Sequence, residues 1–314
     1  MAGKIATRNA YGETLARLAD EYPNVVVLDA DLSGSTMSKF FADAHPDRFF
    51  DCGIAEANMT GIAAGLAACG YKPFTNSFAI FAAGRAYEQI RNSIAYPHLN
   101  CTIVGSHGGV SVGEDGATHQ CTEDFALMRA LPGMLVCCPC DGNEMRYAVE
   151  ALIKYNGPAY LRLARPATEI ITDEIPGYKF ELGKGATLRD GKDVTIIATG
   201  ILVPQAMKAA EALESDGVSA RVIDMHTIKP LDAELVVKAA KETGCIVTAE
   251  EHSVIGGLGS AVCELLSEVR PTPVLRVGVN DKFGRSGKAN EMLDYFGLNA
   301  EGIAAKAREA VRLK

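Results

Sequence analysis

The sequence predicts an α/β protein with two doubly wound, mostly parallel-sheet domains. Short β-branched runs alternate with segments of helical periodicity along all 314 residues. This length suits two domains of about 150 residues each, and 48% of the residues are hydrophobic, which is ample for two cores. The alternation lapses at 166–192, where proline, glycine and scattered charge indicate a linker between a first domain, 1–165, and a second, 193–314.

In the first domain, apolar runs predict buried strands, and periodic segments that end near Gly, Pro or Asn predict helices. The predicted strands are 25–29, 102–105, 134–138 and 159–163. The predicted helices are 8–20, 56–68, 79–96, 122–130 and 142–155. Such alternation is typical of a parallel sheet with helices on both faces.

The second domain repeats this pattern. Its predicted strands are 194–199, 220–224, 245–249 and 274–279. Its predicted helices are 203–215, 232–242, 260–269 and 301–311. A parallel sheet covered by helices is therefore expected here as well.

Composition excludes several classes of function. A net charge of −8 without a Lys/Arg run argues against a nucleic-acid or anionic membrane surface. The small and apolar stretch 61–70 is too short for a bilayer crossing, and residues 1–5 lead into a polar helix rather than a signal peptide. Nine cysteines, an odd number in mostly apolar segments, indicate reduced thiols. We therefore expect a cytoplasmic protein.

The segment 51–59 places one carboxylate, Glu56, among small and apolar neighbours. Poor hydration disfavours the charged form of a carboxyl group, so Glu56 could share a proton with a ligand nitrogen as a general acid or base. The alternative is a half-buried Glu at the start of a helix. Gly61 and Gly65 on that helix permit close approach of another backbone or of a flat ligand.

Three segments follow predicted parallel strands, where open α/β sheets bind ligands: 29–36, 106–120 and 162–165. The second contains glycines and two histidines that bracket Glu114 and Asp115. Its backbone amides can approach a ligand, while His107, Asp115 and His119 offer donors and acceptors for sugar hydroxyls or phosphate oxygens. The alternatives are a flexible acidic turn, or a zinc site whose spacing fixes no geometry.

Two further groups have structural alternatives. Phe74, Phe78 and Phe81 are core residues by default, but they could form a flat slot for a heteroaromatic ring beside Glu56. The CxxC of 137–140 could be redox-active or bind a metal, yet a metal site calls for a second pair and none follows. No metal ligand is therefore assigned.

Several motifs together resemble the second half of transketolase. They are Gly-Ile-Ala-Glu at 53–56, Gly-Tyr-Lys-Pro at 70–73, Gly-Glu-Asp-Gly-Ala-Thr-His-Gln at 113–120 and Pro-Cys-Asp-Gly-Asn-Glu at 139–144. Thr-Ala-Glu-Glu-His at 248–252 and Gly-Gly-Leu-Gly at 256–259 resemble the C-terminal domain of that family. The resemblance covers nearly the whole chain and implies a pyrimidine-binding domain followed by a transketolase C-terminal domain.

Transketolases use thiamine diphosphate, and the resemblance implies that Glu56 protonates N1′ of its aminopyrimidine. It also implies that Phe78 and Phe81 hold the pyrimidine ring and that Asp31 lies near the thiazolium. The spacing from Phe78 to Arg85 is one residue longer than in some members. The cofactor-binding residues so implied are Glu56, Phe78, Phe81 and Asp31.

The resemblance implies a sugar-phosphate site as well. Its residues are Arg8, Ser35, His107 and Arg165, with Asp115 and His119 beside the sugar hydroxyls. Two guanidiniums and a hydroxyl suit a dianion. The implied catalytic residues are Glu56, His107 and His119.

Family members bind the diphosphate and Mg²⁺ through a Gly-Asp-Gly motif that this sequence lacks. We therefore expect the C-terminal subunit of a split transketolase, active with an N-terminal subunit that carries the diphosphate and Mg²⁺ site, in an α2β2 assembly. Such an enzyme moves a two-carbon ketol unit between sugar phosphates.

Three alternatives share this architecture: a deoxyxylulose-phosphate-synthase-like enzyme, a 2-oxo acid dehydrogenase beta-type subunit and a non-catalytic regulatory subunit. His107 argues against the two enzymes, and the joint presence of Glu56, His107, Asp115 and His119 argues against the regulatory subunit. In the second domain, the glycines of 256–259 predict a tight turn that opens a helix, and His226 and His252 are expected to be structural.

Overall fold

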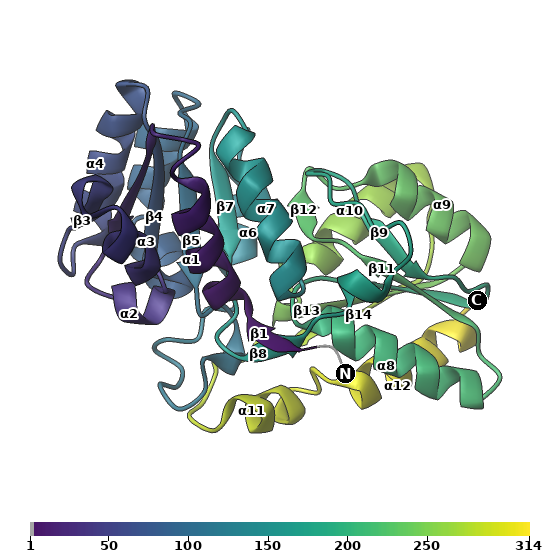
Figure 1. Ribbon diagram of the computed structural model, residues 1–314. Coiled ribbons are helices and arrows are strands. Elements are labelled where there is room, and N and C mark those ends of the chain that lie inside the picture. The colour runs from purple at the N-terminus through teal and green to yellow at the C-terminus, as the bar shows by residue number, and fades with distance from the viewer. Residues whose placement is uncertain (1–2) are drawn as a thin grey trace.

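The computed structural model describes residues 3–314, which form two α/β domains side by side (Figure 1). The first domain has a seven-stranded sheet with the order β12-β6-β7-β5-β4-β2-β3. Only β12, from the second half of the chain, is antiparallel to its neighbour. The strands are β2 (Val25–Asp29), β3 (Phe49–Asp51), β4 (Lys72–Phe78), β5 (Thr102–Ser106), β6 (Leu135–Cys137), β7 (Ala159–Arg162) and β12 (Thr227–Lys229).

Helices cover both faces of this sheet because alternate strand residues point to opposite sides. Val25 and Val27 of β2 pack with one apolar core, and Val26 and Leu28 pack with another. The first face carries α1 (Thr7–Leu18), α3 (Lys39–Ala44) and α7 (Gly142–Lys154). The second face carries α4 (Glu56–Ala68), the π-helical segments η2 (Ile80–Arg85) and η3 (Ile90–Ala95), α5 (Tyr87–Gln89) and α6 (Asp124–Arg129).

The second domain has a five-stranded sheet with the order β14-β13-β10-β11-β9, in which only β9 is antiparallel to its neighbour. The strands are β9 (Ala186–Arg189), β10 (Val194–Ala198), β11 (Ala220–Asp224), β13 (Ile246–Ser253) and β14 (Val274–Val279). The helices are α8 (Leu202–Ser215), α9 (Ala233–Thr243), α10 (Leu258–Val269), α11 (Ala289–Tyr295) and α12 (Ala300–Arg312).

The two domains share buried structure. Phe125 and Met128 of α6 belong to the same apolar core as Leu258 and Val262 of α10. Figure 1 also shows α11 extending below the first domain. The two domains are therefore joined by a common apolar core and by the pairing of β12 with β6.

The predicted fold class is confirmed, since both sheets are mostly parallel and covered by helices. The segment predicted as a linker contains two strands that the sequence analysis missed. In it, β8 (Ala167–Glu169) pairs with β1 (Lys4–Ala6), and β9 lies at the edge of the second sheet. Four further strands, β1, β3, β4 and β12, were not predicted from the sequence either. Among residues 3–314, no helix has both the length and the apolar character needed to cross a membrane.

Short elements complete the first domain and its loops. They are α2 (Ser33–Thr36) and the 3₁₀ turns η1 (Pro46–Arg48), η4 (Val110–Val112) and η5 (Thr172–Glu174). Of these, α2 follows β2 and η4 follows β5. Both therefore lie in loops at the carboxyl ends of parallel strands.

Candidate active site

The candidate residues gather at the carboxyl edge of the first sheet. Asp29, the last residue of β2, is level with Asp51 of β3, and Phe78 of β4 is level with Ser106 of β5. The loops that follow these four strands therefore converge on one region. They carry Asp31 and Ser35, Glu56, Phe81 and His107, respectively.

Glu56 is the first residue of α4, and only 4% of its surface is exposed. A carboxylate in the first turn of a helix is favoured by the unpaired amides there. Its Oε1 lies 3.3 Å from Nη1 of Arg85. The expected water-poor position of Glu56 is confirmed, whereas its cationic neighbour was not anticipated.

Aromatic rings form a row beside Glu56. Phe78 stacks on His107 with centroids 4.1 Å apart and lies nearly parallel to Phe81 at 6.0 Å. The Arg85 guanidinium covers Phe81, with its central carbon 4.1 Å from the ring centroid. Phe78 and Phe81, placed in the core or in a flat slot by the sequence alone, therefore lie in one continuous group with Glu56.

The local backbone that builds this row is π-helical. The single helix predicted over 79–96 is wrong in detail: η2 and η3 are π-helical and flank the short α5. A π turn contains one more residue than an α turn and often marks a functional site. Here it places Arg85, the last residue of η2, over Phe81 and beside Glu56.

His107 is buried and held in the left-handed backbone region, with φ of 57°. Burial, together with the nearby charges of Arg8 and Arg165, lowers the pKa of His107 to about 3. Nε2 is 3.4 Å from the Arg8 guanidinium, and Nδ1 is 2.8 Å from Ser106 Oγ. Because an arginine can only donate, Nε2 accepts and the proton of the neutral ring is assigned to Nδ1.

Two guanidiniums lie near His107. Burial and the charge of Arg165 lower the pKa of Arg8. Arg8 donates to the carbonyl oxygen of Ser35 at 2.8 Å, while its buried Nε has no partner among the described residues. Arg165 contacts the Val112 carbonyl and lies 3.4 Å from Glu114. Arg8, Ser35, His107 and Arg165 are thus brought together.

The remaining predicted residues lie around this group. His119 approaches Phe78 and Phe81 edge-on, with centroid distances of 6.1 and 5.3 Å. Asp115 is exposed on the same loop, and no hydrogen bond of its side chain is found within residues 3–314. Asp31 is exposed with φ of 61°, and its amide donates to Asp51 Oδ1 at 3.2 Å.

Asp29 is a supporting residue that the sequence analysis did not single out. Its buried carboxylate accepts hydrogen bonds from Leu32 N, Thr36 Oγ1 and Ser38 Oγ at 2.6, 2.7 and 2.8 Å. Burial raises the pKa of Asp29 to about 6. These bonds shape the loop that presents Asp31 and Ser35. An Asp at a strand end followed by Ser and Thr is the signal that could have revealed this role.

The second domain contributes structural polar groups, as expected. His252 is fully buried and stacks on Phe125, and His226 is buried and stacks on Phe180. Gly257 is the N-cap of α10, and its turn is closed by Glu250, which accepts from the amides of Leu258 and Gly259 at 2.7 and 2.8 Å. The predicted tight turn is confirmed.

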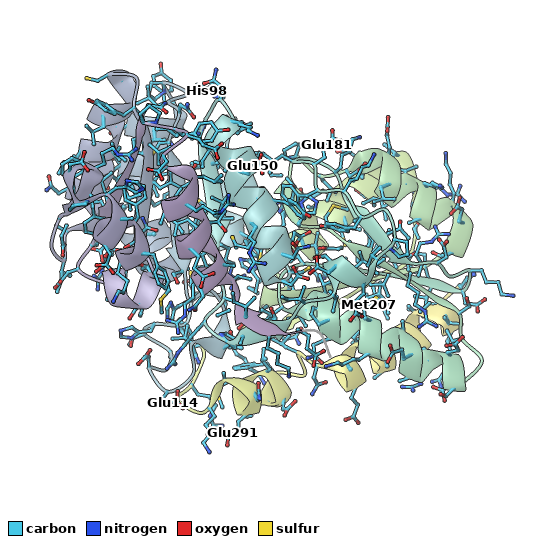
Figure 2. The ribbon with its side chains drawn as sticks, viewed as in Figure 1. His98, Glu114, Glu150, Glu181, Met207 and Glu291 are labelled. Carbon is cyan, nitrogen blue, oxygen red and sulfur yellow. The ribbon has the colours of Figure 1, made fainter. Side chains whose placement is uncertain are left out.

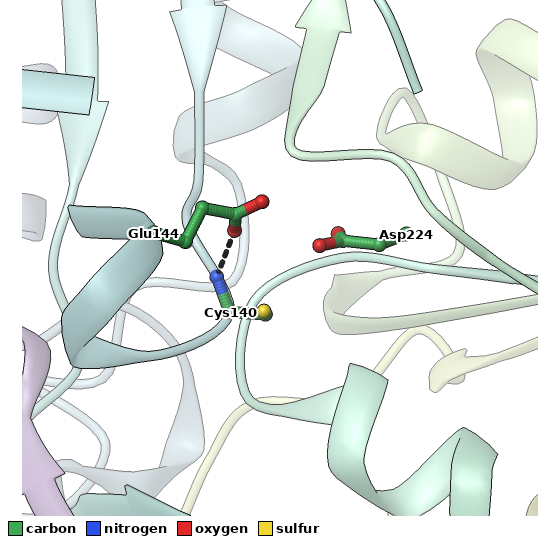
Figure 3. Close-up of side chains that lie close together, drawn as sticks. All are labelled: Cys140, Glu144 and Asp224. Carbon is green, nitrogen blue, oxygen red and sulfur yellow. Dashed lines mark hydrogen bonds between the residues drawn. The ribbon is translucent and has the colours of Figure 1, made fainter. Parts of the chain in front are cut away.

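The CxxC lies in the seam between the domains. The ligating atoms of Cys140, Glu144 and Asp224 lie within 4.8 Å of one another, and all three side chains are fully buried (Figure 3). Glu144 accepts from the amide of Cys140 at 2.6 Å and from Tyr178. Burial raises the pKa of the Cys137 and Cys140 thiols well above the usual value, which disfavours a reactive thiolate.

Comparison with known families gives two matches in chain order. The transketolase pyrimidine-binding domain matches residues 3–169, and the transketolase C-terminal domain matches residues 183–303. Together they span most of the chain.

Individual relatives point to the same family. A protein of Methanocaldococcus jannaschii described as a putative transketolase C-terminal section is 51% identical over 306 residues, 97% of this chain and 96% of the relative. A 6-deoxy-6-sulfo-D-fructose transketolase subunit of a Clostridium species is 45% identical, over 98% of this chain and 95% of the relative. A solved structure described as a split gene transketolase, inactive beta4 tetramer, superposes with a TM-score of 0.90 at 50% identity, covering 99% of this chain and all of that one.

Proposed function

The chain belongs to the transketolase family, of which it contains the pyrimidine-binding and C-terminal domains, and from this premise we propose that it is the C-terminal subunit of a split transketolase. The proposed reaction transfers a two-carbon ketol unit from a ketose phosphate to an aldose phosphate. The observation that carries the proposal is a buried Glu56 beside an aromatic row, a neutral histidine and two guanidiniums.

The residues present fit the pyrimidine half of thiamine diphosphate. Glu56 is buried next to the face formed by Phe81 and Arg85, where a flat ring can lie against the aromatic row. When bound, thiamine diphosphate would supply the electron sink that lets the bond beside a ketose carbonyl break. Glu56 would hold the proton at the N1′ nitrogen of the pyrimidine. Phe78 and Phe81 would orient the ring.

Arg8 and Arg165 suit the phosphate of a sugar. Arg8 retains a buried donor, Nε, that has no partner within residues 3–314, and its guanidinium is already fixed by the Ser35 carbonyl. A second positive charge nearby favours a dianion over a neutral group. Ser35 would add a hydroxyl at this end of the substrate, and Asp31 would lie toward the thiazolium.

The histidines and Asp115 suit sugar hydroxyls. His107 remains neutral at physiological pH, so it exchanges hydrogen bonds with hydroxyl groups without adding charge. His119 and Asp115 lie on the same loop and would form hydrogen bonds with neighbouring hydroxyls or accept their protons. The relative from Clostridium is named for a sulfonated sugar, so we expect the donor and acceptor sugars to differ among members of this family.

A partner subunit would complete the cofactor site. The outer face of α4 exposes Gly61, Ile62 and Gly65, with open space above both glycines, and Ile54 is 75% exposed just before this helix. A smooth apolar face next to Glu56 suits packing of another subunit. The names of the relatives, a subunit and a C-terminal section, support this view. The partner would bind the diphosphate and Mg²⁺, and two such pairs would form an α2β2 assembly.

The test is reconstitution. The purified chain is mixed with a candidate N-terminal subunit, thiamine diphosphate and Mg²⁺, and xylulose 5-phosphate with ribose 5-phosphate is compared with pyruvate as substrate. Ketol transfer that requires both subunits is expected. Full activity of this chain alone would contradict the split enzyme, and turnover of pyruvate in place of the ketose would favour the synthase-like or dehydrogenase-like alternatives.

A further inference from the structure

The loop that carries His107, Asp115 and His119 is held from behind by the second domain. Glu251, near the end of β13, accepts a hydrogen bond from the amide of Ser111 with Oε1 at 2.5 Å. Ser111 lies in η4, midway along that loop, and both residues are buried. The proposed substrate groups belong to the first domain, whereas this acceptor belongs to the second.

The neighbours of Glu251 leave room for this bond and brace it. A side chain at Gly109 would overlap the Glu251 carboxyl group, so glycine is required there. Arg162 donates from Nη2 to the carbonyl oxygens of Glu251 at 2.8 Å and Cys121 at 3.3 Å. Cys121 in turn pairs with Gly109 across the base of the loop. The hydrogen bond between Glu251 and Ser111 is therefore one of several contacts that join the base of this loop to β13.

The tip of the same loop meets the second domain again. Ser286 donates from Oγ to the Glu114 carbonyl at 2.5 Å, and Gln120 donates to the Arg285 carbonyl at 2.9 Å. Figure 2 shows Glu114 close to Glu291 of α11 at the lower edge of the molecule. Of these side chains, Glu251 is the one that reaches the middle of the loop from the second sheet.

We infer that Glu251 is a positioning residue through which the second domain holds the loop 106–120 in place. Its carboxyl group accepts a hydrogen bond from the Ser111 amide and so fixes the positions of His107, Asp115 and His119. This inference rests on the proposed function for its kinetic consequence only. The role in holding the loop is a property of the chain itself. A rigid supporting contact of this kind preserves the geometry of groups that touch the substrate.

Glutamine is the informative conservative replacement. Burial raises the pKa of Glu251 to about 7, with Arg162 and the Ser111 amide opposing the shift, so an uncharged group is compatible with the site. Glu251→Gln keeps a carbonyl oxygen at the same reach, whereas Glu251→Asp keeps the acid but withdraws it by one carbon. If the hydrogen bond matters, glutamine preserves the loop and aspartate releases it.

The experiment measures hydrogen–deuterium exchange of the intact chain over residues 106–121, followed by kinetics of the reconstituted enzyme. Glu251→Asp and Glu251→Ala should speed exchange of this loop by about tenfold, the loss of one hydrogen bond to a carboxylate, while Glu251→Gln stays near wild type. Glu250→Gln is the matched control, because Glu250 is a buried neighbour on β13 that binds the α10 amides instead.

In the assembled enzyme, Glu251→Asp should raise KM for the ketose phosphate about tenfold, the kinetic counterpart of the same lost bond, with kcat changed much less. Unchanged exchange of the loop in both Glu251→Asp and Glu251→Ala would overturn the inference, as would an equal effect in Glu250→Gln. An equal loss in Glu251→Gln would also contradict it. Faster loop exchange with no ketol transfer by the wild-type pair would sustain the loop contact and reject the proposed function.

Discussion

At the scale of single residues, the neutral His107 is the feature with the clearest physical consequence. It is only 3% exposed, stacks on Phe78 and lies beside two guanidiniums. Burial and the two guanidiniums oppose a second proton on the ring. The imidazole therefore stays neutral across the whole physiological pH range.

The same residue makes stability depend on pH. The pKa of His107 falls to about 3 on folding, so between pH 6.5 and 3 the unfolded chain binds a proton that the folded chain does not. Its contribution to stability is therefore constant above that window and declines as the pH falls through it. Between pH 7 and pH 5 this residue should lower the free energy of unfolding by about 2 kcal/mol.

The measurement is chemical unfolding of wild type and His107→Asn at pH 7 and pH 5. The variant should lose less stability on acidification. His98→Asn is the matched control, because His98 has a similar left-handed backbone, with φ of 54°, but is exposed. Equal acid sensitivity of wild type and His107→Asn would show that the ring is not held neutral by its surroundings.

At the scale of elements, the seam between α7 and β11 buries two carboxyl groups close together, those of Glu144 and Asp224. Asp224 at the end of β11 is fully buried, and neither carboxyl oxygen has a hydrogen-bond partner within residues 3–314. It faces Glu144 of α7 (Figure 3). Burial and the adjacent Glu144 carboxyl raise the pKa of Asp224 well above its usual value.

Asp224 should therefore weaken the protein at high pH. A raised pKa means that the folded chain keeps a proton that the unfolded chain loses, so stability declines as the pH rises toward the pKa of the folded state. Asp224→Asn should raise the melting temperature at pH 9 relative to wild type and have little effect at pH 4, as thermal unfolding would show. The exposed Asp190→Asn serves as control, with its side chain 94% exposed. If the gain in melting temperature of Asp224→Asn over wild type did not grow with pH, the proposed burial of a protonated Asp224 would be wrong.

Elements with uniform periodicity could be predicted from the sequence, and those governed by tertiary contacts could not. The helix from Glu56 to Ala68 and the strands β2, β11 and β14 were predicted with their observed bounds. By contrast, β4 was not predicted because much of its sequence is polar. It contains Lys72, Thr75, Asn76 and Ser77, all buried. These polar side chains find partners that only the folded chain supplies. For example, the hydroxyl of Tyr11 donates to Asn76 Oδ1 at 2.7 Å.

The candidate site shows the same division. His107 and Arg165 could be singled out because they stand in loops after predicted strands, and Glu56 because it lies among small and apolar neighbours. Arg8 was assigned only by the family resemblance. The pairing of Arg85 with Glu56 could not, since it depends on a π turn that a 3.6-residue period does not reveal. Glu251 was missed because its contact joins residues 140 positions apart in different domains.

At the scale of the whole molecule, the exposed face of α4 is the proposed contact with the partner subunit. Ile62→Glu places a charge on this face, where Ile62 is 41% exposed, and should abolish or strongly weaken assembly. The folded chain itself should be unaffected. Val269→Glu is the control, because Val269 is 57% exposed at the end of α10 in the other domain. Size-exclusion chromatography of the mixed subunits measures the effect, and assembly of Ile62→Glu at wild-type concentrations would rule this face out.

The central claim is that Glu56 activates the cofactor, and the most direct measurement is hydrogen–deuterium exchange at the thiazolium C2 of thiamine diphosphate in the reconstituted complex. Glu56→Gln should slow this exchange by a factor of about a hundred or more, because a glutamine cannot hold the proton at N1′. The exposed Glu88→Gln should exchange as wild type does. Equal exchange rates in wild type and Glu56→Gln, with the cofactor bound in both, would contradict the account.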